Sequence, residues 1–156
     1  MINQILEFRK TETQNKKLCV SKDNLAALVT EVSLRYKELN LNKEVEFNIT
    51  IKPEPLSLYF DREIVTMILD NLISNAAKYT EKGYINISLY TTRKNDTDYV
   101  EIKVSDTGQG ISADELPHIF ERYYQARSDR QASGTGIGLA LVKNLAKLHQ
   151  GEIYAE

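Results

Sequence analysis

The sequence has little cysteine, glycine or proline and no long hydrophobic run. Its one cysteine, Cys19, cannot form an intramolecular disulfide, which favours a reducing compartment such as the cytoplasm. Seven glycines and three prolines in 156 residues argue against a fibrous or largely disordered chain. No apolar run reaches the roughly 20 residues that span a bilayer, and no signal peptide begins at Met1. We therefore expect no direct membrane contact.

Neither sign of charge dominates the sequence. Twenty basic residues stand against 22 acidic ones, and the net charge of −2 gives no reason to propose nucleic acid as a partner. The hydrophobic fraction is 42%, as in soluble globular proteins, and 156 residues are enough for one ordinary domain with its own core.

Apolar residues recur at three- and four-residue steps in several segments, which predicts amphipathic helices. The predicted helices cover 23–39, 61–79 and a segment from Gly138 to about Leu148, and a helix end is predicted near the N-terminus from Ile2, Ile5, Leu6 and Phe8. The segment 114–124 is predicted to be helical in part, and 125–133 to be a mobile loop.

Other segments alternate between apolar and polar residues, which predicts half-buried strands. These are 45–51, 84–91 and 99–105, with a short strand at 56–60 and another beginning at Ile153. The polar stretch 93–98 is predicted to connect an antiparallel hairpin. The mixture favours a sandwich in which helices cover one face of a sheet.

The helix 61–79 carries the first group of candidate functional residues. Asn71, Asn75 and Lys78 fall within roughly 60° of one another beside its apolar stripe. A carboxamide oxygen can ligate magnesium without adding negative charge beside a nucleotide. The alternative is a polar flank that makes only local hydrogen bonds.

Two glycine-rich turns form the second group. Asp106-Thr-Gly-Gln-Gly-Ile111 follows a strand, where a fixed carboxylate can accept a hydrogen bond from an exocyclic amine such as that of adenine. Gly134-Thr-Gly-Ile-Gly138 precedes a helix and can offer backbone amides to an anion. It is neither a Walker loop nor a dinucleotide fingerprint. The alternatives are an ordinary turn and a flexible helix cap.

An aromatic and basic segment, 119–125, lies between the two glycine-rich turns. Its aromatic residues can anchor a lid, and Arg122, Arg127 and Arg130 can meet phosphate. The alternative is a helix turn in the core followed by a solvated loop.

In their order and spacing, these segments resemble the nucleotide-binding boxes of sensor histidine kinases. Asn71–Thr80 resembles the N box, Asp106–Ile111 the first glycine box, Ile119–Tyr124 the phenylalanine box and Gly134–Leu139 the second glycine box. The resemblance covers about Asn42 to the C-terminus, and Leu6–Thr13 resembles the tail of the second dimerisation helix. It implies that 1–20 belong to a helical hairpin and linker, and 21–156 to a catalytic domain.

The resemblance implies the Bergerat ATP-binding fold, an α+β two-layer sandwich with a mixed, mostly antiparallel sheet covered by three helices on one face. It implies ATP and Mg²⁺ as cofactors, with Asn75 and Asn71 at the metal and Lys78 at phosphate. It also implies contacts with the nucleotide from a further set of residues: Tyr79, Asp106, Gly108, Gly110, Ile111, Gly134, Thr135, Gly136, Gly138 and Leu139. Arg122 is the candidate for the γ-phosphate. Many kinases have an arginine near position 125, and this chain departs from that pattern with Gln125.

The resemblance also bears on the reaction. Gyrase-like ATPases have a glutamate that activates water where this chain has Asn71, and an amide cannot act as a base at neutral pH. Transfer of the ATP γ-phosphate to a protein group is therefore expected over hydrolysis. The expected partners are the dimerisation and phosphoacceptor domain of the same kinase and the receiver domain of a response regulator.

His118 and His149 are the two histidines of the chain, and neither has the sequence context of a phosphoacceptor. We therefore expect the chain to bind ATP without phosphorylating itself. The family usually dimerises through its helical hairpin, of which only the tail is expected here, so a monomer is expected. The resemblance also implies the cytoplasmic part of a membrane-anchored kinase. The alternatives are a gyrase-like ATPase or an anti-sigma serine kinase of the same fold, and a non-catalytic module for nucleotide binding or interaction.

Overall fold

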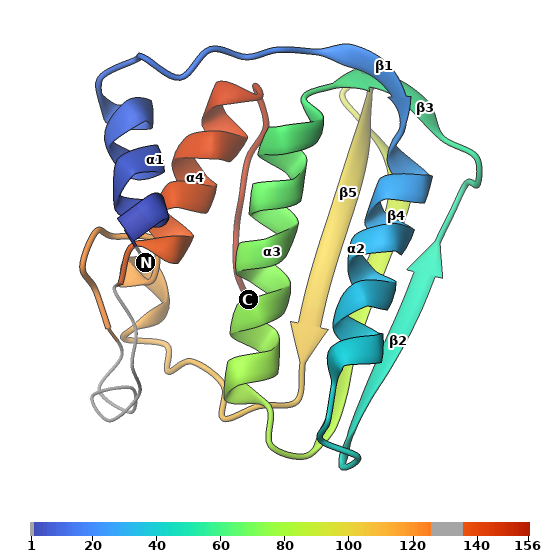
Figure 1. Ribbon diagram of the computed structural model, residues 1–156, viewed down its shortest axis with the longest axis vertical. Coiled ribbons are helices and arrows are strands. Elements are labelled where there is room, and N and C mark those ends of the chain that lie inside the picture. The colour runs from blue at the N-terminus through green and yellow to red at the C-terminus, as the bar shows by residue number, and fades with distance from the viewer. Residues whose placement is uncertain (1, 126–135) are drawn as a thin grey trace. The chain divides into compact units, whose positions relative to one another are not determined.

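The computed structural model describes residues 2–125 and 136–156, which Figure 1 shows as a ribbon. The chain forms two compact units. We call residues 20–109 the sheet unit, and residues 1–19 together with 110–156 the helical unit. The loop predicted at 125–133 lies outside the described residues except for Gln125, as do the candidate residues Gly134 and Thr135.

The sheet unit contains five strands and two helices. In chain order they are β1 Ser21–Asn24, α2 Leu25–Leu39, β2 Val45–Ile51, β3 Ser57–Phe60, α3 Arg62–Tyr79, β4 Gly83–Lys94 and β5 Thr97–Asp106. The main sheet has the order β2-β4-β5, with β2 parallel to β4 and β4 antiparallel to β5. Strands β1 and β3 form a separate antiparallel pair. Helices α2 and α3 lie on the same face of the main sheet (Figure 1).

Side chains at the ends of strands start both helices of the sheet unit. The side chain of Asp61 accepts a hydrogen bond from the Ile64 amide at 3.1 Å, and that of Asn24 accepts one from Ala27 at 3.2 Å. Each acceptor satisfies an amide that the first helical turn leaves without a partner. The predicted start of the helix at residue 23 is thus corrected to Leu25, because Asp23 and Asn24 belong to β1.

The core of the sheet unit lies between the helices and the main sheet. The alternating residues of β2 and β4 point their apolar side chains inward, as the sequence predicts. The buried set comprises Leu28, Val29 and Val32 of α2, Val45 and Phe47 of β2, Leu69, Ile73 and Ala76 of α3, and Ile85, Ile87 and Leu89 of β4. Ile73 is fully buried, although the apolar stripe expected from the sequence omits it and consists of Ile64, Val65, Ile68, Leu69, Leu72 and Ala76.

The hairpin between β4 and β5 is tighter than the sequence predicts. Strand pairing continues to Lys94 opposite Thr97, so only Asn95 and Asp96 form the turn. Both have positive φ, at 49° and 62°. Two left-handed residues give a turn whose twist matches that of the flanking strands, and asparagine and aspartate tolerate this conformation.

The helical unit consists of α1 Ile2–Glu12, the 3₁₀ turn η1 Leu116–His118 and α4 Gly138–Leu148. Helices α1 and α4 are in contact, and the Asn144 amide donates a hydrogen bond to the Thr11 hydroxyl at 3.0 Å. Only η1 is helical in the predicted segment 114–124. The strand predicted from Ile153 is absent from the described residues, since no strand of the helical unit is there to pair with it.

The predicted α+β class with a mixed sheet is confirmed. Two helices cover the main sheet within its own unit, and a three-helix cover stays a prediction. So does the division of the chain into a linker at 1–20 and a catalytic domain at 21–156. Among the described residues, no helix is both long and apolar enough to span a membrane.

Candidate functional site

The second half of α3 carries the two candidate metal ligands on one face. Asn71 and Asn75 are one helical turn apart, which places their side chains next to each other. Asn71 is buried, and its side-chain nitrogen donates to the Met67 carbonyl at 2.8 Å. This bond engages the nitrogen of the carboxamide, whereas a metal ion would be bound through the oxygen.

Lys78 and Tyr79 end the helix that begins at Arg62. The Lys78 ammonium lies 3.0 Å from the Tyr79 hydroxyl and 4.8 Å from the centre of its ring. The two side chains therefore form a cation–π pair at the C-terminal end of α3. Their predicted contacts with a nucleotide remain predictions.

Asp106 is the last residue of β5. Its carboxylate accepts a hydrogen bond from the Gly108 amide at 2.8 Å, which orients the side chain at the start of the glycine turn. The carboxylate is exposed. It therefore combines a fixed direction with access to a ligand, as recognition of an exocyclic amine requires.

Gly108 brings this turn against the end of α3. A Cβ at this position would lie 2.4 Å from the Tyr79 carbonyl oxygen and 2.8 Å from Asp106 Oδ1. The resemblance assigns this glycine to a close approach of the base. The structure adds a second reason for glycine here, because the backbone of Tyr79 already occupies the space that a Cβ would fill.

Thr107 and Gly83 lock the same turn to β4, and the sequence analysis missed their role. The Thr107 hydroxyl donates to the Lys82 carbonyl and accepts from the Tyr84 amide, both at 3.0 Å. Gly83 has a φ of 106°, and a Cβ there would overlap Thr107 Oγ1. The sequence signal for this role is the single glycine between the helix predicted at 61–79 and the strand predicted at 84–91.

In the helical unit, Gly110 and Ile111 begin the segment after the turn. Gly110 has a φ of 72°, and a Cβ there would contact nothing within 4 Å. The backbone conformation is thus the reason for glycine at this position. Ile111 is 48% exposed, so its apolar side chain is open to a ligand or partner.

Gly136, Gly138 and Leu139 lie at the start of α4. Gly136 has a φ of 67°, and a Cβ there would lie 2.8 to 2.9 Å from backbone atoms of Tyr123 and Tyr124. Its carbonyl accepts from the Tyr123 amide at 2.9 Å. The second glycine box is therefore packed on the phenylalanine box. Among the described residues, no side chain caps α4, and the backbone amides of its first turn can meet an anion.

Arg122 makes a contact that the sequence analysis did not foresee. Its guanidinium lies 2.9 and 3.1 Å from the two carboxylate oxygens of Glu12 in α1. It also lies 5.7 Å from the ring centre of Phe8 and 5.5 Å from that of Tyr123. In this conformation Arg122 joins α1 to the phenylalanine box, and its role at a phosphate stays a prediction.

The two histidines lie in the helical unit. His118 Nδ1 is 2.7 Å from the Glu121 carboxylate, and its ring lies 5.7 Å from that of Tyr124. His149 is the C-cap of α4.

The candidate metal ligands on α3 fit a metal ion that is also bound by the phosphates of a ligand. Among the described residues, no group of three or more histidine, cysteine or acidic side chains could hold a metal ion. Neutral amide oxygens on α3 fit magnesium, which usually takes few protein ligands and completes its shell with phosphate oxygens and water.

Solved structures of histidine kinases share this fold. Full-length ShkA in complex with AMPPNP matches with a TM-score of 0.79 and 25% identity, over 94% of this chain and 30% of that one. The nucleotide-free catalytic domain of histidine kinase ThkA matches with a TM-score of 0.72 and 26% identity, over 88% of each chain. The protein thus has the α+β fold of histidine kinase catalytic domains.

Residues 60–156 match the family described as histidine kinase-, DNA gyrase B-, and HSP90-like ATPase. The match covers more than half of the chain, and the chain belongs to this family. The resemblance to sensor histidine kinases is confirmed by its relatives. The aerobic respiration control sensor protein ArcB homolog of Haemophilus influenzae is 39% identical over 150 residues, and Histidine kinase P4 of Formosa agariphila is 32% identical over 158. These alignments cover 95% and 98% of this chain, but 45% and 11% of the relatives, so the chain spans less than half of either.

Proposed function

We propose that this chain is the catalytic domain of a sensor histidine kinase, which binds Mg²⁺-ATP and transfers the γ-phosphate to a histidine on a separate dimerisation domain. The observation that carries the proposal is the exposed carboxylate of Asp106, fixed by Gly108 at the end of β5. Gly108 in turn packs on the end of the helix that carries Asn71 and Asn75. The relatives, one named a histidine kinase and one a sensor protein, favour this activity over gyrase-like ATP hydrolysis.

Within the sheet unit, Asp106 accepts a hydrogen bond from the adenine amino group, and Tyr79 lies against the nucleotide. Asn75 and Asn71 would hold magnesium through their amide oxygens, and Lys78 would leave the Tyr79 hydroxyl to meet phosphate. Magnesium, when bound, neutralises charge on the phosphates. Within the helical unit, Gly110 lets the base come close and Ile111 contacts the nucleotide. The second glycine box wraps the phosphates through Gly134, Thr135, Gly136, Gly138 and Leu139.

The chemistry then rests on position and on charge rather than on a protein base. Asn71 cannot take a proton from water, so we expect ATP hydrolysis far below the typical turnover of about 10 per second. The acceptor histidine belongs to the dimerisation domain, and a receiver domain takes the phosphoryl group from it. His118 is paired with Glu121 and is not the acceptor.

Calorimetric titration with a non-hydrolysable ATP analogue tests the adenine site. We expect micromolar to sub-millimolar binding by the unaltered chain and none by Asp106→Ala. Asp98→Ala is the matched control, because Asp98 is an exposed aspartate at the other end of β5. Circular dichroism establishes that each variant is folded. Equal binding by all three proteins would refute the role of Asp106.

A second titration, with and without magnesium, tests the metal site. Asn75→Ala should lower affinity in magnesium and leave magnesium-free binding unchanged. Incubation with ATP followed by mass spectrometry tests the separation from the acceptor, since stoichiometric phosphohistidine on this chain would contradict the proposal.

A further inference from the structure

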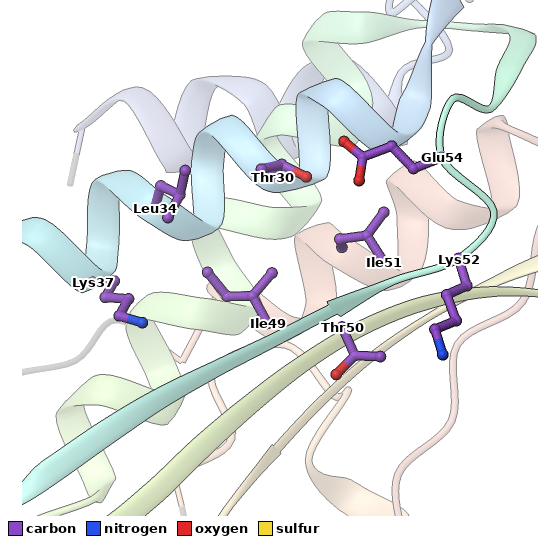
Figure 2. A pocket seen from close by; sticks show the side chains of 8 residues that line it. All are labelled: Thr30, Leu34, Lys37, Ile49, Thr50, Ile51, Lys52 and Glu54. Carbon is purple, nitrogen blue, oxygen red and sulfur yellow. The ribbon is translucent and has the colours of Figure 1, made fainter.

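The outer edge of β2 is open along the main sheet. β2 is an end strand in the order β2-β4-β5, and no strand of the described residues pairs with its other side. An open groove of about 460 Å³ runs beside this edge, between β2 and α2. Figure 2 shows Ile49 and Ile51 pointing from β2 toward α2, and Thr50 and Lys52 pointing away from that helix.

The backbone bonds of β2 establish which of its residues face the open edge. The Lys52 amide donates to the Leu89 carbonyl, and the Glu44 carbonyl accepts from the Gly83 amide, both at 2.9 Å. The backbone groups of successive residues in a strand point to alternate sides. Even-numbered residues therefore bond to β4, and the amides and carbonyls of odd-numbered residues point to the open edge.

Three odd-numbered residues remain available at this edge. Val45 is already satisfied, because its amide donates to the Asn42 carbonyl and its own carbonyl accepts from the Asn40 side chain. Phe47, Ile49 and Ile51 have no recorded backbone partner on the open side within the part of the chain that the structure describes. Unpaired strand edges are templates for pairing with another strand.

We propose that β2 pairs with β2 of a second copy of this chain, antiparallel and centred on Ile49. A two-fold axis makes two identical neighbouring strands antiparallel. Centring on Ile49 places all three available residues opposite one another, with Phe47 facing Ile51 of the second copy and Ile49 facing Ile49. It also places Pro53, which has no amide to donate, opposite the satisfied Val45. The result is one continuous six-stranded sheet.

Charge complementarity supports the same register. Pairing centred on Ile49 places Glu46 directly opposite Lys52 of the second copy, and the two-fold axis repeats this pair. Both side chains are exposed, and no ion pair is recorded for either within the described residues. Directly opposed residues of opposite charge stabilise strand pairing, and like charges weaken it. On the inner face, the half-buried side chains of Ile49 and Ile51 of the second copy would lie at the groove beside Leu34, which is 41% exposed.

The contact is short, so we expect weak self-association, in place of the monomer expected from the sequence. Sedimentation velocity on the whole chain, from about 1 μM to about 1 mM, should show a concentration-dependent dimer. Glu46→Lys and Lys52→Glu should each raise the dissociation constant about tenfold, because each places two pairs of like charges in contact. The double variant should restore the original value. Lys94→Glu is the control, since it makes the same charge change in the hairpin of β4 and β5.

Amide hydrogen exchange by NMR locates the contact. The amides of Phe47, Ile49 and Ile51 should exchange more slowly as the protein concentration rises, whereas those of Asn48 and Thr50 already bond to β4 and should not change. A monomer at about 1 mM would overturn the proposal. So would a dimer that neither single reversal weakens, or one in which exchange at Phe47, Ile49 and Ile51 is independent of concentration.

Discussion

In the sheet unit, the candidate residues lie on α3 and at the end of β5, two elements that regular hydrogen bonding holds in place. In the helical unit, most of the described candidates lie on irregular backbone, where Gly110, Tyr123 and Gly136 have positive φ. Gly138 and Leu139 are the exception, because they begin α4. Side-chain hydrogen bonds of Arg122 with Glu12 and of Asn144 with Thr11 join α1 to the second segment of that unit. The first unit thus holds its candidates on or directly beside regular secondary structure. The second holds its candidates through a few turns and polar contacts, each of which a single substitution can disturb.

The largest expected effect is on the core of the sheet unit. Ile87 is fully buried in β4, and Ile87→Ala should lower the free energy of unfolding by about 2 to 5 kcal/mol, because it leaves a cavity. Ile111→Ala in the helical unit is the matched control, with a change within about 0.5 kcal/mol, since Ile111 is exposed. Urea denaturation measures both. Similar losses in the two variants would break the comparison.

The next largest effect is the loss of stability when a glycine of either unit is replaced by alanine. Gly108→Ala and Gly136→Ala each place a methyl group within 3 Å of backbone atoms, and each should cost about 1 to 3 kcal/mol. Gly110→Ala meets no atom and should cost about 1 kcal/mol, from left-handed strain alone. Thermal and urea denaturation give the order. If Gly110→Ala costs as much as Gly136→Ala, the packing of the second glycine box on Tyr123 is unimportant.

A smaller effect concerns the ion pair that joins α1 to Arg122. Glu12→Gln should lower the free energy of unfolding by up to about 1 kcal/mol, because both side chains are partly exposed. The loss should shrink in high salt, which screens the pair. Glu152→Gln, an exposed glutamate of the same unit, should have no effect. A loss of equal size in low and high salt would show that the contact is not electrostatic.

The smallest effect is a pH dependence in the sheet unit. Burial, followed by the charge of Asp70 and a hydrogen bond to it, raises the pKa of Tyr36 to about 12. A phenol with a raised pKa keeps its proton longer in the folded state. Its contribution is therefore complete below pH 10 and is lost as the pH rises from about 10 to 12. We expect less than about 1 kcal/mol, since the side chain is only half-buried.

Urea denaturation of the unaltered chain and of Tyr36→Phe, from pH 8 to about pH 12, isolates this contribution. The unaltered chain should lose stability relative to the variant only in the upper part of that range. Parallel curves would mean that Tyr36 ionises equally in both states.

Local patterns were sufficient to predict most helices and strands. Val45, Phe47, Ile49 and Ile51 alternate, and β2 has these bounds. The apolar steps after Asp61 predict α3, and the Asp61 side chain caps it. Such periodicity can be detected in the sequence because one face of each element is buried and the other is solvated. Four short motifs in a fixed order were also enough to predict the family.

Such local patterns could not predict contacts between residues that are distant in the sequence. Ser21–Asn24 has no apolar alternation, and it forms a strand only because β3 pairs with it. Ile153 has the character of a strand but has no partner strand among the described residues of its unit. Glycine is required at 83, 108 and 136 even without a nucleotide, because a Cβ would collide with Thr107, Tyr79 and Tyr123, respectively. Only folding brings these residues close to the glycines.

The sequence by itself determined the class of fold, the family and the set of candidate residues, because these depend on residue types at short spacings. The tertiary structure alone decided three other features: the partner of Arg122, the direction of Asp106 and the open edge of β2. Each depends on contacts, or on the lack of them, between residues that are far apart in the sequence. Such contacts leave no pattern in the local spacing of residue types.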